Sequence, residues 1–332
     1  MKIVLDGMGG DNAPRSIVEG AFMAINEYKD IEIIITGDKE KIEKELDDFK
    51  CDKSKISIVH TSQVIENEDK PVTAIRSKKD SSMVVALNLV KNKEADVIIS
   101  AGSTGALLSG GIFILKRIKG ISRPCICTCM PTITGGVTLL SDTGANVDCS
   151  VENLKDFAVM TDIYARNVLK IENPRVALAN NGTEEGKGNS LVKDTYEELK
   201  NMPALNFIGN MEPREVLNGV CDIIICDGFV GNMILKTLEG TAISLFKVLK
   251  EAMMSSTKSK IGALMMKKDL YKVKSLLDYK EVGGSPFLGI EGGMIKAHGS
   301  SDARAIKNAI RQGIALQKGQ VVENIKAYIE NK

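Results

Sequence analysis

The sequence contains one strand-and-turn pattern twice. Residues 96–108 read DVIISAGSTGALL, and residues 222–234 read DIIICDGFVGNMI. In each copy an acidic residue precedes a run of branched aliphatic residues, which predicts a strand buried on both faces. Gly-x-x-Gly follows, and helices are expected at residues 106–116 and about 232–250. Strand, turn and helix in repetition build a mainly parallel sheet, so this pattern restricts the fold more than any other feature.

The rest of the chain alternates in the same way. Further strands are expected at residues 2–6, 31–36, 56–60, 126–130, 137–141, 175–179, 207–208 and 221–226, and further helices at about 14–28, 39–49, 82–92, 152–170 and 189–200. We therefore predict an α/β fold with a doubly wound, mainly parallel sheet, forming a single catalytic unit over residues 1–332. Ligands of such sheets bind beyond the carboxyl ends of the strands.

Glycine-rich and polar turns stand at those predicted carboxyl ends. Glycine accepts φ > 0 and lets a ligand approach the main chain, and the first N–H groups of a helix attract anions. The turns therefore predict phosphate or carboxylate binding, although each turn taken singly could be an ordinary β–α connection. The candidate binding residues are Gly9, Gly10, Gly102, Ser103, Thr104, Gly105, Asn146, Gly182, Thr183, Asp227, Gly228, Gly231 and His298.

Lys187 is a further candidate because it lies between two glycines, just before a helix that Asn189 or Ser190 could cap. A lysine at a helix start is unfavourable because its charge opposes the helix dipole, but a bound anion beside it would offset this cost. The alternative is a surface lysine without a ligand. His298 lies in IKAHGSSDARAI before another helix, and there the alternative is a structural histidine beside a helix cap.

Composition and motifs argue against several functions. The 44 basic and 43 acidic residues create no global field for nucleic acid, and with 4% aromatic residues base stacking is not expected. Asn12 stands where a dinucleotide fingerprint after the first strand needs glycine. Gly-x-Ser-x-Gly does not occur at a strand–helix turn, so no serine hydrolase triad is predicted.

Cysteine usage and the first residues favour the cytoplasm. Seven cysteines fit a reducing compartment. Cys125, Cys127 and Cys129 share one face of a strand, and we interpret them as buried residues and not as metal ligands. No signal peptide is visible at the start. Residues 97–115 are long enough to span a membrane, but their glycines favour a strand, a loop and a buried helix.

Several segments together resemble one family. LDGMGGDNAP, SAGSTGALL, DTGANVD, NGTEEGKGN, CDGFVGNMILKTLEG and IKAHGSSD occur in an order and spacing similar to the PlsX family of bacterial phosphate acyltransferases, from residue 1 to about 317. The resemblance implies an isopropylmalate dehydrogenase-like fold, a homodimer, and transfer of a fatty acyl group from acyl carrier protein to inorganic phosphate. The acyl phosphate would then pass to a downstream membrane acyltransferase of phospholipid synthesis.

The same resemblance implies that Lys187 and Asn232 are catalytic. Phosphate can itself be the nucleophile, so the enzyme must supply a cation and hydrogen-bond donors for the developing oxyanion. We expect Lys187 to be the cation and Asn232 the amide donor, with no cofactor and no metal.

Two other classes of protein stay open. A metal- and nicotinamide-dependent dehydrogenase on the same fold would use carboxylates such as Asp142, Asp148 and Asp227 as metal ligands. A non-enzymatic scaffold for a carrier protein or a membrane is the third reading.

Residues 247–280 carry nine lysines and few acidic residues. Leu264, Met265 and Met266 stand beside Lys267 and Lys268, which is typical of a segment at a membrane surface. The family resemblance implies a projecting helical hairpin here. We expect it to be a tip that makes peripheral contact with anionic membranes, and the alternative is a hydrophobic dimer contact.

Overall fold

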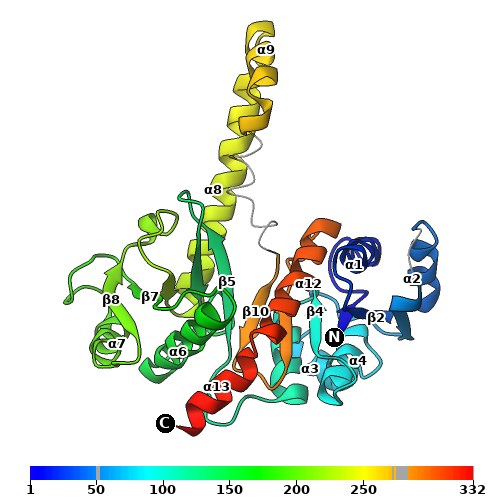
Figure 1. Ribbon diagram of the computed structural model, residues 1–332, viewed down its shortest axis with the longest axis horizontal. Helices are drawn as coiled ribbons and strands as arrows, with labels where there is room; N and C mark the ends of the chain where they lie inside the picture. The colour runs from blue at the N-terminus through cyan, green and yellow to red at the C-terminus, as the bar shows by residue number, and fades with distance from the viewer. Residues whose placement is uncertain (50–52, 271–272, 274–282, 332) are drawn as a thin grey trace.

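The computed structural model describes residues 1–49, 53–270, 273 and 283–331, and its strands form one sheet (Figure 1). The order across the sheet is β3-β2-β1-β4-β11-β10-β5-β6-β9-β7-β8. The strands are β1 (Lys2–Asp6), β2 (Glu32–Gly37), β3 (Ile56–His60), β4 (Val97–Ser100), β5 (Cys125–Pro131), β6 (Val137–Ser141), β7 (Arg175–Ala179), β8 (Asn206–Met211), β9 (Ile223–Ile225), β10 (Ser285–Leu288) and β11 (Gly293–Lys296).

The strand direction reverses in the middle of this sheet. Strands β3, β2, β1, β4 and β11 run parallel to one another, and so do β6, β9, β7 and β8. Between the two groups, β10 is antiparallel to both β11 and β5, and β5 is antiparallel to β6. Lys296 at the end of β11 pairs with Ser285, and Ser141 at the end of β6 pairs with Cys127. The carboxyl ends of the two parallel groups therefore approach one another across β10 and β5.

Helices cover both faces of the sheet. The helices are α1 (Arg15–Glu27), α2 (Lys39–Leu46), α3 (Pro71–Ser77), α4 (Ser82–Lys91), α5 (Thr104–Gly110) with a π-helical turn (Gly111–Leu115), α6 (Val151–Asn167), α7 (Ser190–Lys200), α8 (Gly228–Met254), α9 (Thr257–Met265), α12 (Ala303–Lys318) and α13 (Val321–Glu330). Short 3₁₀ turns lie at Lys53–Lys55 and Pro213–Glu215. One face carries α1, α2, α6, α7, α12 and α13, and the other carries α3, α4 and α5 over the first group of strands and α8 over the second.

This double covering explains the aliphatic runs in the sequence. In β4, Ile99 packs into the first face and Ile98 into the second, and both are buried. In β9, Ile225 and Ile224 divide in the same way. The prediction of a mainly parallel α/β sheet is thus confirmed. Residues 97–115 divide into β4, α5 and the π-helical turn, and none of the described helices is long and apolar enough to cross a membrane.

The predicted start of the second repeated helix was wrong. Helix α8 begins at Gly228 and not at Asn232, because Asp227 caps it by accepting a hydrogen bond from the Val230 N–H at 2.8 Å. Likewise α5 begins at Thr104, capped by Ser103. Gly105, Gly228 and Gly231 therefore belong to first helical turns, while Gly102 precedes the Ser103 cap. None of these four glycines has a positive φ.

Close packing, not φ, explains the glycines at the start of α8. A Cβ atom on Gly231 would lie 1.9 Å from the carbonyl oxygen of Asp142, and one on Gly228 would lie 2.6 Å from that of Asn146. Only glycine lets the first turn of α8 pack directly on the loop after β6.

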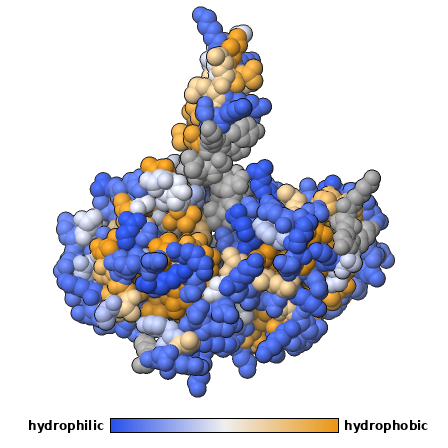
Figure 2. Space-filling model, viewed as in Figure 1, coloured by the Kyte–Doolittle hydropathy of each residue, from blue (hydrophilic) through white to orange (hydrophobic). Residues whose placement is uncertain are grey.

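Helix α8 extends well beyond the sheet (Figure 1). Its 27 residues correspond to a length of about 40 Å, and α9 lies beside its far end. Figure 2 shows hydrophobic residues along this projection. Leu264, Met265 and Met266 in this part of the chain have 71%, 82% and 56% of their surface exposed. Of the projecting hairpin predicted at 247–280, residues 271–272 and 274–280 lie outside the described residues.

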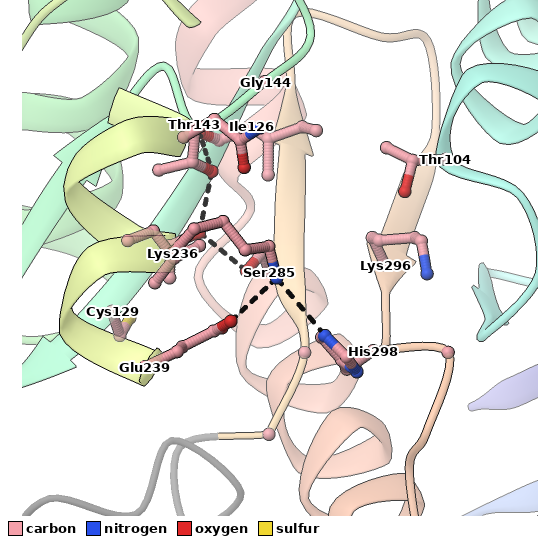
Figure 3. A pocket seen from close by; sticks show the side chains of 16 residues that line it. Thr104, Ile126, Cys129, Thr143, Gly144, Lys236, Glu239, Ser285, Lys296 and His298 are labelled. Atoms are coloured by element: carbon pink, nitrogen blue, oxygen red, sulfur yellow. Dashed lines mark hydrogen bonds and ion pairs between the residues drawn. The ribbon is translucent and has the colours of Figure 1, made fainter. Parts of the chain in front are cut away.

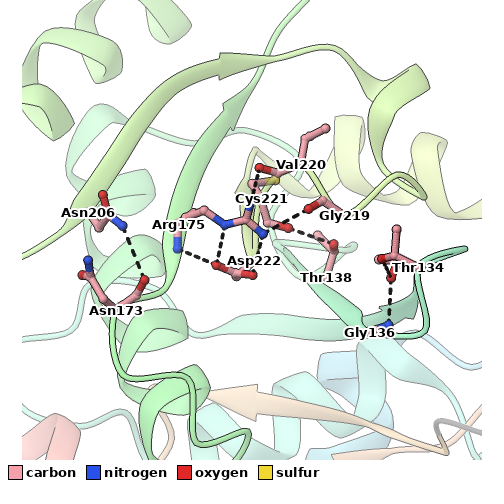
Figure 4. A network of polar contacts seen from close by, with 11 residues as sticks. Thr134, Gly136, Thr138, Asn173, Arg175, Asn206, Gly219, Val220, Cys221 and Asp222 are labelled. Atoms are coloured by element: carbon pink, nitrogen blue, oxygen red, sulfur yellow. Dashed lines mark hydrogen bonds and ion pairs between the residues drawn. The ribbon is translucent and has the colours of Figure 1, made fainter.

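A polar network joins the amino ends of β7 and β9, at the end of these strands away from the α8 start (Figure 4). The Arg175 side chain donates to both carboxylate oxygens of Asp222 at 3.0 Å, and to the carbonyl oxygens of Gly219 and Val220. The Asp222 carboxylate also accepts from the main-chain N–H of Arg175 at 2.8 Å. This network holds the register of the second group of strands, and we assign it no catalytic role.

We predict that Gly231→Ala destabilises the protein by about 1–3 kcal/mol or more, because its methyl group overlaps the Asp142 carbonyl. Gly240→Ala in the same helix is the matched control, since nothing lies within 4 Å of its added Cβ. Alanine favours the helix over glycine, so Gly240→Ala should stabilise by up to about 1 kcal/mol. Urea unfolding of both variants measures the difference, and equal stabilities would contradict the packing role of Gly231.

Candidate active site

A cavity of about 380 Å³ opens over the middle of the sheet. Helix α5 covers the strands on one side of it and α8 covers the strands on the other. Strands β10 and β5 lie between these helices and form the floor, which includes Ile126, Thr128 and Ser285. The cavity therefore occupies the place where the strand direction reverses, beside the carboxyl ends of β11 and β6 (Figure 3).

Hydroxyl groups line part of this floor. The Oγ1 atom of Thr128 lies 2.8 Å from Oγ1 of Thr143 and 2.9 Å from Oγ of Ser285. The three residues come from β5, the loop after β6, and β10. These hydroxyls give the floor polar groups that can both donate and accept hydrogen bonds.

One wall is the inner face of α8. Asn232, Lys236 and Glu239 lie on successive turns and line the cavity. The ammonium of Lys236 is 2.7 Å from a Glu239 carboxylate oxygen, and this lysine is half exposed. Asn232 also lies against the loop after β6, because a Cβ on Gly144 would be 3.7 Å from its side-chain amide carbon.

The opposite wall carries Thr104, Lys296 and His298. Nε2 of His298 lies 3.4 Å from the Lys236 ammonium, and Nδ1 accepts a hydrogen bond from the Ser300 N–H at 3.2 Å. Burial first and the Lys236 charge second lower the pKa of His298, so the ring favours the neutral form at pH 7. Burial likewise lowers the pKa of Lys296 to about 8.

A buried carboxylate lies behind this wall. Asp6, at the end of β1, is 1% exposed and accepts hydrogen bonds from the hydroxyls of Ser82 at 2.5 Å and Ser100 at 2.7 Å. Burial raises the pKa of Asp6, and the two hydroxyls and the charge of Lys296 act in the opposite direction. Gly9 and Gly102 pack tightly here, since a Cβ on Gly9 would lie 2.5 Å from the Asp6 carboxylate and 2.8 Å from the Gly102 nitrogen.

A second buried carboxylate organises the loop after β6. Asp142 accepts hydrogen bonds from the N–H groups of Ile126 at 2.9 Å and Asn146 at 2.7 Å, and from the Asn146 amide at 2.9 Å. The N–H groups of Gly144 and Ala145 are also donors to it. Burial raises the pKa of Asp142, against the effect of these donors. This loop carries Thr143 and Gly144 to the cavity and supports the first turn of α8.

The structure brings three of the predicted site residues to the cavity, namely Thr104, Asn232 and His298. Gly9, Gly10 and Gly102 pack behind the wall, Ser103 and Asp227 cap helices, and Gly105 faces Pro71. Asn146, Gly228 and Gly231 hold the loop after β6 against α8. Whether these residues bind substrate remains a prediction.

Lys187 does not line the cavity. It is exposed on the loop after β7, which also carries the buried Gly182 and the exposed Thr183. Its carbonyl oxygen accepts a hydrogen bond from the Asn180 amide at 3.1 Å. Asn189 caps α7, as one of the two predicted candidates. Strands β6, β9 and β7 are parallel neighbours, so the loop of Lys187 emerges at the same edge of the sheet as Gly144 and the start of α8.

Sequence reasoning missed the cavity residues Lys236, Glu239, Ser285 and Lys296. The pattern of Lys236 and Glu239, one and two turns after Asn232, was readable as a helix face. Lys296 could have been found as a lysine at the end of an aliphatic strand, two residues before His298. The short strands β10 and β11 have no clear periodicity, and this concealed them.

Two of the three carboxylates considered for a metal site have other partners. Asp142 accepts main-chain N–H groups and Asp227 caps α8, while Asp148 is exposed. Within the described part of the chain, no group of three or more His, Cys, Asp or Glu side chains is placed to hold a metal ion.

The amino-acid sequence matches known proteins over nearly its full length. A family model described as "Fatty acid synthesis protein" matches residues 1–324. The phosphate acyltransferase of Clostridioides difficile (strain 630) is 64% identical over 329 residues, covering 99% of this chain and 96% of that one. The phosphate acyltransferase of Alkaliphilus oremlandii (strain OhILAs) is 53% identical over 325 residues, covering 98% and 96%.

Solved structures share the fold at low sequence identity. The EutD phosphotransacetylase from Staphylococcus aureus superposes with a TM-score of 0.59 at 15% identity, covering 96% of this chain and 94% of that one. A 4-hydroxythreonine-4-phosphate dehydrogenase from Klebsiella pneumoniae gives 0.54 at 12% identity, covering 96% and 98%. At such identities these likenesses establish the fold alone, and they confirm the predicted fold class.

We predict that Asp142→Ala costs at least about 3 kcal/mol of unfolding free energy, because several buried N–H groups lose their acceptor. Asp148→Ala is the control, since that carboxylate is exposed on the same loop and should change stability by less than about 0.5 kcal/mol. Chemical denaturation measures both. If the two variants were equally stable, the loop would not depend on Asp142.

Proposed function

The chain belongs to the fatty acid synthesis protein family of phosphate acyltransferases, and we propose that it uses the cavity between α5 and α8 to move a fatty acyl group from acyl carrier protein to inorganic phosphate. The observation that carries the assignment to this cavity is its pair of cationic walls. Lys236 stands on α8, and Lys296 with His298 stands opposite. Two negative groups, the phosphate and the oxyanion that forms from the thioester carbonyl, need such surroundings.

The reaction requires little covalent chemistry from the protein. A phosphate oxygen attacks the thioester carbonyl carbon, the carbonyl oxygen gains negative charge, and the carbon–sulfur bond breaks as the carrier thiolate leaves. The thiolate has an ordinary pKa of about 8.5, so it leaves without obligatory protonation. The protein has to hold the two reactants together and place donors at the oxyanion.

Asn232 and Lys187 are our candidates for two of these tasks. The Asn232 amide lies at the cavity wall on α8, where it can donate to the oxyanion or to phosphate. Lys187 lies on the loop after β7, at the same edge of the sheet. An exposed lysine on a glycine-flanked loop can move toward a bound anion without disturbing the core.

A homodimer and a peripheral membrane contact belong to the same proposal. Ile243, Leu245 and Val248 on α8 are 64%, 56% and 63% exposed. A helix with this much exposed apolar surface needs a partner, and a second copy of the chain could supply it. At the far end, exposed Lys267 and Lys268 stand beside the tip residues Leu264, Met265 and Met266. Such a tip would bring the acyl phosphate to a downstream membrane acyltransferase.

The purified protein should convert acyl carrier protein thioester and phosphate into acyl phosphate and free carrier thiol. We predict that Lys187→Ala and Asn232→Ala each lower turnover, Lys187→Ala by about 100-fold or more, with an unchanged melting temperature. Asn232 is not the cap of α8, so its loss should not weaken the helix. Lys193→Ala, an exposed lysine on the following helix, is the control.

Several outcomes would contradict this assignment. Wild-type protein that makes no acyl phosphate, or that consumes a nicotinamide cofactor in its place, would overturn the function. If Lys187→Ala had the same turnover as the control Lys193→Ala at saturating phosphate, Lys187 would not be a catalytic residue. Asn232→Ala that melts earlier but turns over normally would make Asn232 a structural residue.

We predict weak, salt-sensitive binding of the protein to anionic lipid vesicles. Changing Leu264, Met265 and Met266 together to Ser should abolish it, because the tip then loses its apolar surface. The double change of Lys267 and Lys268 to Glu should also weaken it, because attraction to anionic lipid is lost. Vesicle sedimentation measures binding, and light scattering measures the oligomeric state.

The triple variant should remain a dimer and keep its activity on the soluble carrier substrate. Unchanged sedimentation of that variant would reject the membrane contact. A variant that dissociates into monomers would instead assign the tip to the dimer interface.

A further inference from the structure

Lys296 occupies an unusual position in the cavity wall. It is the last residue of β11, where this strand runs parallel to β4, and it is only partly exposed. Its ammonium donates a hydrogen bond to the Ala101 carbonyl oxygen at 3.4 Å, just past the end of β4, and another to the carbonyl oxygen of Ala297. Figure 3 shows it on the wall with Thr104, across the cavity from Lys236 and Glu239.

No carboxylate of the described residues forms an ion pair with Lys296. Other lysines of this protein do have such partners, for example Lys236 with Glu239 and Lys307 with Glu27, each at 2.7 Å. An ammonium has three donors, and the two carbonyl oxygens take two of them. The third donor is left for a group that enters the cavity.

The surroundings of Lys296 balance its charge only in part. Asp6 behind it and Asp11 nearby favour the charged form, and Lys236 opposes it. Taking a cation out of water is costly unless an anion or several hydrogen bonds compensate. A bound dianion would supply that compensation, and inorganic phosphate is the dianion that this reaction uses.

We propose that Lys296 is a catalytic residue whose ammonium binds the attacking phosphate in the cavity. The inference rests on the proposed function for the identity of the anion. The phosphate oxygen forms a bond to the acyl carbon, and the carbon–sulfur bond breaks with its electron pair going to sulfur. The proton of monohydrogen phosphate ends on the carrier thiol through solvent. Lys296 keeps its own proton and offsets the negative charge that Lys236, paired with Glu239, cannot neutralise alone.

This role makes activity depend on pH in a defined direction. The pKa of Lys296 is lowered to about 8, chiefly by burial, while Asp6 and Asp11 raise it and Lys236 lowers it. His298 on the same wall is mainly neutral, and Glu239 is paired. Phosphate is already mainly dianionic above neutral pH. The value of kcat/KM for phosphate should therefore fall as the pH rises through about 8, where Lys296 loses its charge.

The test compares Lys296→Met and Lys296→Arg with the wild type and with Lys2→Met. Lys2 is the first residue of β1, at the end of this strand away from Asp6 and the cavity, and its side chain is half exposed. The Lys2→Met variant should therefore behave as the wild type. We expect Lys296→Met to lower kcat/KM for phosphate by about 100-fold or more. Lys296→Arg should recover part of the lost kcat/KM. In this variant kcat/KM should no longer fall at high pH, because arginine stays charged. A Met variant with wild-type kcat/KM, or an Arg variant that still loses activity near pH 8, would overturn the proposal.

A second measurement separates this inference from the proposed function. Inorganic phosphate should raise the melting temperature of the wild type and of Lys2→Met, but not of Lys296→Met. If the wild type made no acyl phosphate but showed this pattern, the proposed reaction would fail while the Lys296 site stood. Equal phosphate-induced shifts in all three proteins would reject Lys296 as the phosphate ligand. Should Lys296→Met fail to fold, the pH profile of Lys296→Arg decides the question.

Discussion

Strands β10 and β5 run antiparallel to their neighbours on both sides, and much of the molecule follows from that pairing. They join two groups of parallel strands whose directions are opposite. The carboxyl ends of both groups, where loops and helix starts are found, then meet over the middle of one sheet. Because α5 and α8 each cover only their own group, the two middle strands between them form the floor of a cavity. Side chains from α5, α8, β5, β10 and β11 and from the loops after β6 and β11 reach that cavity.

Two buried carboxylates give the cavity its shape without facing the ligand. Asp142 holds the loop after β6, and the glycine-rich first turn of α8 packs closely against this loop. Asp6 lies behind Lys296 and helps that lysine to keep its charge. An acidic side chain that faced the cavity would repel a phosphate there. Asp6 and Asp142 are instead buried among N–H and hydroxyl donors, where they position a lysine and the start of a helix.

The same fold serves dehydrogenases and phosphotransacylases, so the fold does not identify the reaction. The cavity residues are more informative. Lys236, Lys296 and His298 surround a hydroxyl-lined floor, which suits an anionic nucleophile better than a hydride donor. Of the carboxylates that a metal-dependent dehydrogenase could use, Asp142 accepts main-chain N–H groups, Asp227 caps α8, and Asp148 is exposed.

Local sequence determined most of the secondary structure, because buried strands and capped helices leave patterns within a few residues. The aliphatic runs at β4 and β9 could be read directly, and Asn189 was one of two residues expected to cap α7. The short strands β10 and β11 could not, because they form through pairing with β5 and β4, which are distant in the sequence. Only the tertiary structure therefore decided that Lys236 and Lys296 face one cavity and that Lys187 lies outside it. A charge in the sequence acquires its role from the long-range contacts that bury or expose it.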